Sequence, residues 1–142
     1  PKFEIVVVVP DVTVETRRAR AVLPDKVHMR DAVSNLSWAS GMVHAMMKRD
    51  VPAIASHLDD SLSIPYRKSL VPGYDAVRES ALSAGALGVS LGGSGPAVFA
   101  IATGGSAKIR LAMARAFKES AGLGSESFVT FPGEGARIES VS

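Results

Sequence analysis

The chain has 142 residues, of which 46% are hydrophobic and 21% charged, as expected for one globular domain and not for a disordered segment. Its formal net charge is +2, its basic residues are interleaved with acidic ones and only 6% of residues are aromatic, so the composition does not favour nucleic-acid binding. Cysteine is absent, which excludes disulfides, thiolate nucleophiles and cysteine-based metal sites.

The longest apolar run, Ile5 to Val9, is much shorter than the roughly 20 residues that a membrane-spanning helix needs. No secretion signal is recognisable, and the lack of cysteine fits a reducing compartment. We therefore expect a cytoplasmic protein with no membrane partner. Because the chain starts without Met and enters a strand almost at once, we also expect it to be the interior of a longer polypeptide.

The first predicted element is a strand over residues 3–9, because apolar and β-branched residues line both of its faces. This strand is expected to be largely buried. A short polar helix follows, with Thr13 or Asp11 as its candidate N-cap, and it stops at Leu23-Pro24.

The strongest helical pattern in the sequence runs from Asp31 to Arg49. Its apolar residues recur at steps of three and four and form a single stripe, made of Ala32, Val33, Leu36, Met42, Val43, Met46 and Met47. We expect this stripe, methionines included, to be core and not a cofactor site. Gly41 either costs about 1 kcal/mol relative to alanine or marks close packing.

The remaining elements follow without regular β-α-β repetition. Helices are predicted over 51–61, 74–84 and 107–121, and strands over 86–91, 97–102, 128–131 and 136–141. A stiff connector with prolines near both ends covers residues 64–73. This order predicts one α+β domain over residues 1–142, an antiparallel sheet with helices stacked on one face.

A loop rich in glycine lies between two of these strands, with the sequence Gly92-Gly93-Ser94-Gly95, and Pro96 closes it. Its backbone N–H groups suit an anion, and its composition suits a plain hairpin connection equally well. The loop is not a P-loop, because the required Lys and Ser/Thr are missing. It is not a dinucleotide-binding loop either, because a strand follows it instead of a helix.

Two basic segments are candidate binding elements. Arg20 either shares a solvated basic face with Arg17 and Arg18, or turns inward to hold a carboxylate or phosphate through two hydrogen bonds. Thr16 stands four residues before Arg20, so its hydroxyl would lie on the same helical face. Arg67, in the stiff connector, is either an exposed loop residue or a side chain placed for a ligand.

The sequence gives little support for a metal site or a serine nucleophile. The three histidines, His28, His44 and His57, lack the spacing of paired metal ligands, so no metal site is predicted. Ser90 stands in Gly88-Val89-Ser90-Leu91-Gly92, which matches G-x-S-x-G, but it lies inside the strand predicted over 86–91 and not at a strand-to-helix turn, so no nucleophile elbow is predicted. The catalytic residues are therefore unknown at this point.

Three segments together resemble the homoserine kinases of the GHMP small-molecule kinase superfamily. They are Val8-Val9-Pro10 with Thr16-x-x-Ala19-Arg20 and Leu23-Pro24, then Pro65-Tyr66-Arg67 with Leu70-Val71-Pro72, and finally the glycine loop. The likeness runs in order from about Ile5 to Ile101. The glycine loop alone indicates the superfamily, while the two arginine segments point to homoserine kinases.

The resemblance implies a ferredoxin-like α+β sandwich that forms the C-terminal domain of a kinase of threonine biosynthesis. Homoserine would be the substrate, with Arg20 and Arg67 holding its carboxylate and Thr16 beside them. Gly92, Gly93, Ser94 and Gly95 would support a phosphate-binding loop. ATP and Mg²⁺ would bind mainly to the N-terminal half of the same kinase, which these residues do not include, so the chain alone should be inactive. A second copy, in a homodimer, is a further candidate partner.

Two positions depart from the family pattern. Gly92 stands where a serine is common, and Ala97 stands where Ser or Thr often follows the proline, so two hydroxyl groups are missing. One alternative is a related kinase that acts on mevalonate or shikimate. A second alternative, of another class, is a regulatory module that binds an amino acid without catalysis.

Overall fold

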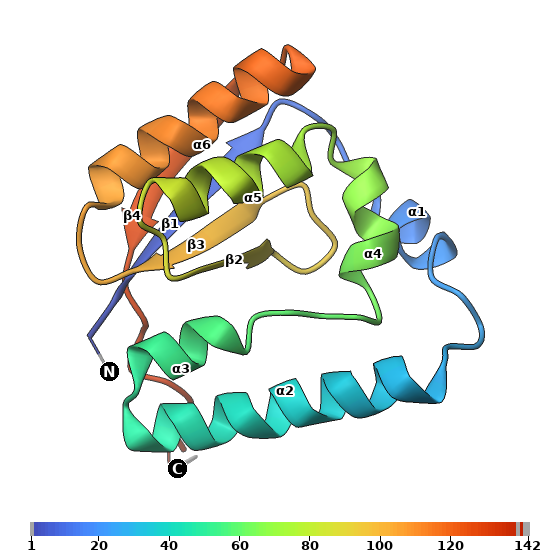
Figure 1. Cartoon of the computed structure of the whole chain (residues 1–142), viewed down its shortest axis with the longest axis vertical. Coiled ribbons are helices and arrows are strands. Elements are labelled where there is room, and N and C mark those ends of the chain that lie inside the picture. Colours follow the sequence, from blue (N-terminus) through green and yellow to red (C-terminus); the bar gives the residue numbers. More distant parts are fainter. Residues whose placement is uncertain (1, 139, 141–142) are drawn as a thin grey trace.

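Strand β1 (Glu4–Pro10) occupies the interior of a four-stranded antiparallel sheet in the computed structural model, which describes residues 2–138 and 140. The strand order is β2-β3-β1-β4. The other strands are β2 (Gly88–Leu91), β3 (Val98–Ala102) and β4 (Ser125–Thr130). Two helices connect strand pairs in a β-α-β-β-α-β plan, which confirms the predicted α+β, ferredoxin-like architecture (Figure 1).

Helices α5 (Tyr74–Ser83) and α6 (Ser106–Ala121) cover one face of the sheet (Figure 1). Alternate residues of β1 point towards them, and Val6 and Val8 are fully buried. The helices contribute the opposite wall of the core, which contains Val77, Ala81, Ile109, Met113, Ala116 and Phe117. This layer is the one that the alternating strands and the α6 periodicity predicted.

Helix α3 (Val51–Ser56) packs on the other face, against Phe3 and Ile101, and forms a second, smaller core. The helices thus cover parts of both faces of the sheet, whereas the sequence predicted helices on one face only. Helix α2 (Met29–Lys48) runs beside α3 at the bottom of Figure 1, with Ala45 buried between them. Gly41 marks close packing, because a Cβ atom there would collide with the His57 ring.

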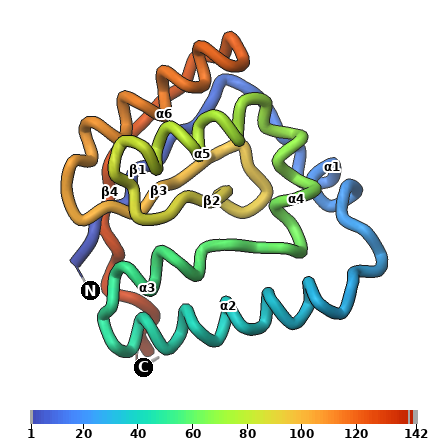
Figure 2. The backbone as a smooth tube through the Cα atoms, viewed as in Figure 1, coloured from blue at the N-terminus to red at the C-terminus, as the bar shows by residue number. Residues whose placement is uncertain are grey.

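Three short helices complete the chain: α1 (Thr16–Ala21), α4 (Ile64–Arg67) and the 3₁₀ helix η1 (Lys68–Leu70). The tube in Figure 2 shows α1 and α4 beside the loop that joins β2 to β3. No helix among the described residues is both long and apolar enough to cross a bilayer.

Four local predictions are wrong. The helix expected over 51–61 ends at Ser56. Helix α1 has Glu15 at its N-cap position instead of Thr13 or Asp11, without a side-chain capping bond. The expected strand over 136–141 is not formed at residues 136–138 and 140, where no neighbouring strand is available, and its other two residues lie outside the described ones. The apolar stripe predicted over Asp31–Arg49 is mostly not core: Met46 and Met47 are 42% and 79% exposed, whereas Met42 packs against the smaller core.

Candidate active site

Arg67 joins the three segments that the sequence singled out. From the end of α4, its Nε–H donates a hydrogen bond to the carbonyl oxygen of Ala19 in α1, at 3.1 Å. Its Nη1 donates another to the carbonyl oxygen of Gly93 in the glycine loop, at 3.2 Å. The guanidinium therefore holds α1 and the loop at one place, and Figure 2 shows these segments side by side.

Hydrogen bonds in the segment just before α4 fix the backbone position of Arg67. The Asp60 carboxylate accepts hydrogen bonds from the N–H groups of Leu62 and Ser63 and from the Ser63 hydroxyl. The Ser63 carbonyl then accepts the N–H of Arg67, at 2.9 Å, in the first turn of α4. An Asp three residues before a Ser, followed by proline at the start of a helix, is a turn signal that the sequence analysis missed.

The glycine loop packs against the connector that carries Arg67. Gly93 and Gly95 have φ angles of +64° and +83°, which residues with a Cβ atom rarely adopt. An added Cβ at Gly95 would lie 3.2 Å from a methyl group of the buried Val71. The Gly92 N–H donates to the Ala97 carbonyl at 2.8 Å, so the loop closes as a hairpin connection.

Some backbone N–H groups of the glycine loop remain available as hydrogen-bond donors. Gly92 and Gly95 use their N–H groups within the loop, whereas those of Gly93 and Ser94 have no partner in residues 2–138 and 140. Two such donors on a sharply turned backbone can meet an anion or an electron-rich neighbouring loop. Both interpretations of the loop therefore remain compatible with its geometry.

Thr16 and Arg20 lie one turn apart on α1, and both side chains are exposed. The residue between them that faces inward is Ala19, which is fully buried and gives its carbonyl to Arg67. Arg20 thus follows directly after the backbone position that Arg67 holds. The structure brings both arginines to the same end of the sheet, with Thr16 on the same helix.

The two arginines at this end of the sheet, Arg20 and Arg67, carry charges that no ion pair in residues 2–138 and 140 neutralises. Arg67 uses two of its five N–H donors on backbone carbonyls, and three remain. A carboxylate or phosphate is the ligand that such donors recognise best.

The described residues do not fit the other groups that a kinase requires. Among them, no cluster of three or more His, Asp or Glu side chains is arranged to hold a metal ion. The lysine of a P-loop is absent from the glycine loop. We therefore derive no catalytic step through ATP or Mg²⁺ from this chain.

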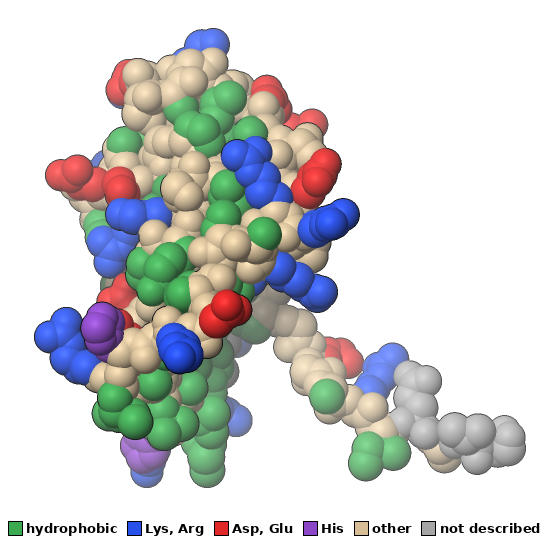
Figure 3. All heavy atoms as spheres, turned by 90° about the vertical axis from the view of Figure 1, so that its right-hand side faces the viewer, with side chains coloured by type: hydrophobic (Ala, Val, Ile, Leu, Met, Phe, Trp, Pro, Cys, Tyr) green, Lys and Arg blue, Asp and Glu red, His purple; other side chains and the backbone are tan. Residues whose placement is uncertain are grey.

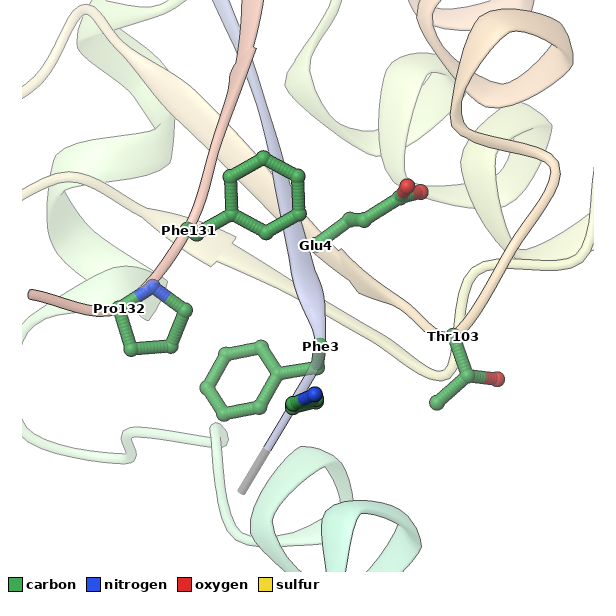
Figure 4. A pocket seen from close by; sticks show the side chains of 6 residues that line it. Phe3, Glu4, Thr103, Phe131 and Pro132 are labelled. Atoms are coloured by element: carbon green, nitrogen blue, oxygen red, sulfur yellow. The ribbon is translucent and has the colours of Figure 1, made fainter.

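A separate depression lies at the other end of the strands. Phe3, Phe131 and Pro132 form its apolar side, while Glu4 and Thr103 extend on the other side of β1 (Figure 4). Its volume is about 420 Å³, and Lys2 completes the lining. Because Glu4 pairs with Ala102 and Val8 with Val98, this depression is separated from the glycine loop by the length of the strands.

Comparison with known proteins supports the family suggested by the sequence. The family model "GHMP kinases C terminal" matches residues 42–119. Homoserine kinase from Thermococcus gammatolerans is 47% identical over 134 residues, and that from Pyrococcus abyssi is 44% identical over 137 residues. These alignments cover 94% and 96% of this chain but only 45% and 46% of the relatives, so the chain spans less than half of their length.

Solved structures agree with the fold. The crystal structure of homoserine kinase from Cytophaga hutchinsonii superposes with a TM-score of 0.85 at 35% identity, over 90% of this chain and 41% of that one. Mevalonate kinase from L. major superposes with a TM-score of 0.64 at 16% identity, a similarity that concerns the fold alone. With a family match over more than half of its residues, the chain belongs to the GHMP kinase C-terminal family.

Proposed function

We propose that this chain is the C-terminal, substrate-binding half of an ATP-dependent homoserine kinase. The observation that carries the proposal is the pair of Arg67 hydrogen bonds, which bring together the three segments in which the sequence resembles homoserine kinases. The relatives of that name align with nearly the whole chain and extend well beyond it. The missing part of such a protein is the expected source of the ATP and Mg²⁺ sites.

In this proposal the two arginines bind the α-carboxylate of homoserine. Arg67 presents its remaining donors while its backbone contacts keep the guanidinium plane fixed, so little side-chain freedom is lost on binding. Arg20 adds a second positive charge from α1, and Thr16 offers a neutral hydroxyl. Phosphoryl transfer depends mostly on positioning, so a carboxylate held at one end orients the substrate hydroxyl at the other.

The glycine loop has a supporting role in the same proposal. The Gly93 carbonyl accepts a hydrogen bond from Arg67, and Gly95 lies close to the side chain of Val71. These contacts tie the shape of the loop to the pair Arg20 and Arg67, which we call the substrate clamp. Its two free N–H groups, on Gly93 and Ser94, would face the phosphate-binding loop of the other half. A change in the clamp would therefore also disturb the space next to the transferred phosphate.

The direct test is phosphorylation by the full-length protein. With ATP and Mg²⁺, we expect phosphohomoserine to form from homoserine, and mevalonate and shikimate to react far more slowly. The 142-residue chain alone should form none. Preference for mevalonate or shikimate would assign the site to another kinase of the superfamily, and the absence of any phosphorylation would favour an amino-acid-binding module.

Substitutions in the clamp test the assigned residues. Arg20→Ala should raise the KM for homoserine roughly 10- to 100-fold, the cost of one charged hydrogen-bonding partner. Arg17→Ala, on the same exposed helix, is the matched control and should leave KM unchanged. Arg67→Lys keeps the charge but cannot reproduce both backbone bonds, so it should lower kcat as well as raise KM. An unchanged KM for Arg20→Ala and Arg67→Lys would contradict the clamp.

A further inference from the structure

The segment that joins α3 to α4, residues 57–63, is tied to helix α2. In Figure 1 this segment runs above the N-terminal half of α2 before the chain turns up into α4. The N–H of Ser61 donates a hydrogen bond to the side-chain oxygen Oδ1 of Asn35 in α2, at 2.7 Å. Both residues are half-buried and lie 26 positions apart, so this bond fixes the segment relative to a distant part of the chain.

Asp60 holds the same segment from within. Its Oδ1 accepts the N–H of Leu62 at 2.7 Å and the N–H of Ser63 at 2.9 Å. Its Oδ2 accepts the Ser63 hydroxyl. Asp side chains close turns in this way, and hydrogen bonds to a charged acceptor are stronger than neutral ones. One carboxylate therefore fixes both the backbone and the side chain of Ser63.

Ser63 passes this position on to Arg67. Its carbonyl oxygen accepts the N–H of Arg67 at 2.9 Å, across the first turn of α4. Pro65 restricts the backbone in the same turn. A shift of Ser63 would therefore move Arg67 and strain its hydrogen bonds to the carbonyls of Ala19 and Gly93.

Helix α4 needs such support because it is short. It has four residues, Ile64–Arg67, and a helix of that length is not stable by itself in water. Figure 3 looks onto the side of the molecule that carries α1 and α4, and Lys and Arg side chains reach into solvent on that side. Long basic side chains lose much freedom when they bind a ligand. An arginine held from behind loses less.

We propose that Asn35 and Asp60 are positioning residues of the candidate active site, which act on Arg67 through residues 61–63. The inference rests on the proposed binding of homoserine by the substrate clamp. Helix α2 thereby contributes to the site from outside it, through the Asn35 side chain. Because phosphoryl transfer depends on alignment, a shift of about 1 Å in a positioning group can lower the rate as much as 100-fold.

The experiment measures the kinetics of full-length variants with homoserine, ATP and Mg²⁺. Asp60→Ala removes three hydrogen bonds, so it should raise the KM for homoserine about 10-fold and lower kcat. Asn35→Ala removes one, so it should raise KM roughly 2- to 5-fold. Asp60→Asn keeps an acceptor oxygen for both N–H groups and should hold KM within about twofold of the unmodified protein.

Matched controls come from the neighbouring residues. Asp59→Ala removes an exposed carboxylate that lies 3.7 Å from Arg78, and it should leave KM unchanged. Ser37→Ala removes an exposed hydroxyl from the other side of α2 and should also have no effect. A variant that only folds less well supplies less active enzyme, which lowers the apparent kcat and leaves KM as it was. A raised KM therefore reports on position.

A double substitution tests the route through Arg67. In an Arg67→Ala protein, Asp60→Ala should change KM by less than about twofold, since the residue on which it acts is gone. An unchanged KM for Asp60→Ala alone, or the same 10-fold rise with and without Arg67, would overturn the proposal.

A last measurement does not depend on activity. The Nε–H of Arg67 donates to Ala19, so its NMR signal in the full-length protein should be protected from solvent exchange. In Asp60→Ala this exchange should be about 10-fold faster, and equal exchange in both proteins would overturn the positioning role. If the unmodified protein does not phosphorylate homoserine, the proposed function fails, and the exchange rates still decide whether Asp60 positions Arg67.

Discussion

Helices α6 and α2 carry apolar stripes with the same helical spacing, and they differ completely in burial. Ile109, Met113 and Phe117 of α6 are fully buried, whereas Leu36 and Met47 of α2 are 71% and 79% exposed. The period of an apolar pattern thus identifies the face of a helix that avoids water. It does not identify what covers that face, which can be the same chain or another one.

The difference has a physical origin in the neighbours of each helix. The stripe of α6 lies on β1 and its neighbours, whose alternate residues form an apolar surface directly beneath it. Helix α2 meets the domain through the short helix α3, and only its opposite side takes part. One helix therefore belongs to the core of the domain, while the other is a projecting element.

The largest effect that tests this difference between α6 and α2 is expected when one apolar side chain of each helix is shortened. Phe117→Ala should lower the free energy of unfolding by about 3–5 kcal/mol, because it leaves a cavity in the main core. Leu36→Ala should change it by less than about 0.5 kcal/mol, because Leu36 is exposed. Urea unfolding of both variants gives the answer, and equal losses would contradict the distinction.

The next effect concerns the attachment of α3, and with it α2, to the sheet. A Cβ atom at Gly88 would lie 2.5 Å from the carbonyl oxygen of Ala55 in α3 and 3.0 Å from Leu58. Gly88→Ala should therefore cost about 1–3 kcal/mol of unfolding free energy and separate α3 from β2. Gly104→Ala is the control, since a Cβ atom there meets nothing within 4 Å. Equal stability of the two variants would refute close packing at Gly88.

A smaller effect is expected at the junction of α2 and α3. The Asp50 side chain caps α3 by accepting the N–H of Ala53 at 3.0 Å. Asp50→Ala should lower the thermal midpoint by an amount equivalent to about 1 kcal/mol, while Asp50→Asn, which keeps an acceptor, should have little effect. A midpoint for Asp50→Ala that matches the unmodified protein would show that the cap does not contribute.

The smallest effect appears only at alkaline pH and reports on the buried layer. Burial raises the pKa of Tyr74, which is 3% exposed, above its ordinary value of 10.0. The unfolded chain ionises first, so the contribution of Tyr74 to stability is complete below about pH 10 and is lost as pH rises through the folded pKa. Tyr74→Phe should match the unmodified protein at pH 7 and lose less stability above pH 10. If the free energies of unfolding of the two proteins fell equally above pH 10, this prediction would be contradicted.

The sequence predicted elements whose signals are local. Strand β1, the hairpin of β2 and β3, and helix α6 follow from alternation, glycine content and helical spacing, and all are confirmed. The residues 136–138 also alternate, yet Ile138 is 100% exposed because no strand lies beside it to accept the pairing. Pairing depends on a neighbour, which a local pattern does not describe.

The candidate site shows the same limit. The sequence singled out Arg67 as a candidate binding residue, but its partners in the structure are backbone carbonyls of Ala19 and Gly93, 48 and 26 residues away. Every residue type supplies such carbonyls, so no side-chain pattern marks them. The roles of Thr16, Arg20 and the glycine loop in binding stay predictions until the kinase assays are made.

The central position of β1 has a consequence for how the chain folds. Val8 of β1 pairs with Val98, and Pro10 pairs with Ser125. Strand β1 is synthesised before both of its neighbours and must wait for them, and such distant pairings slow folding. Until β3 and β4 leave the ribosome, the apolar, β-branched sequence Ile5–Val9 stays unpaired and prone to aggregation. A chaperone that shields this strand during translation would raise the yield of folded protein more than one that acts after release.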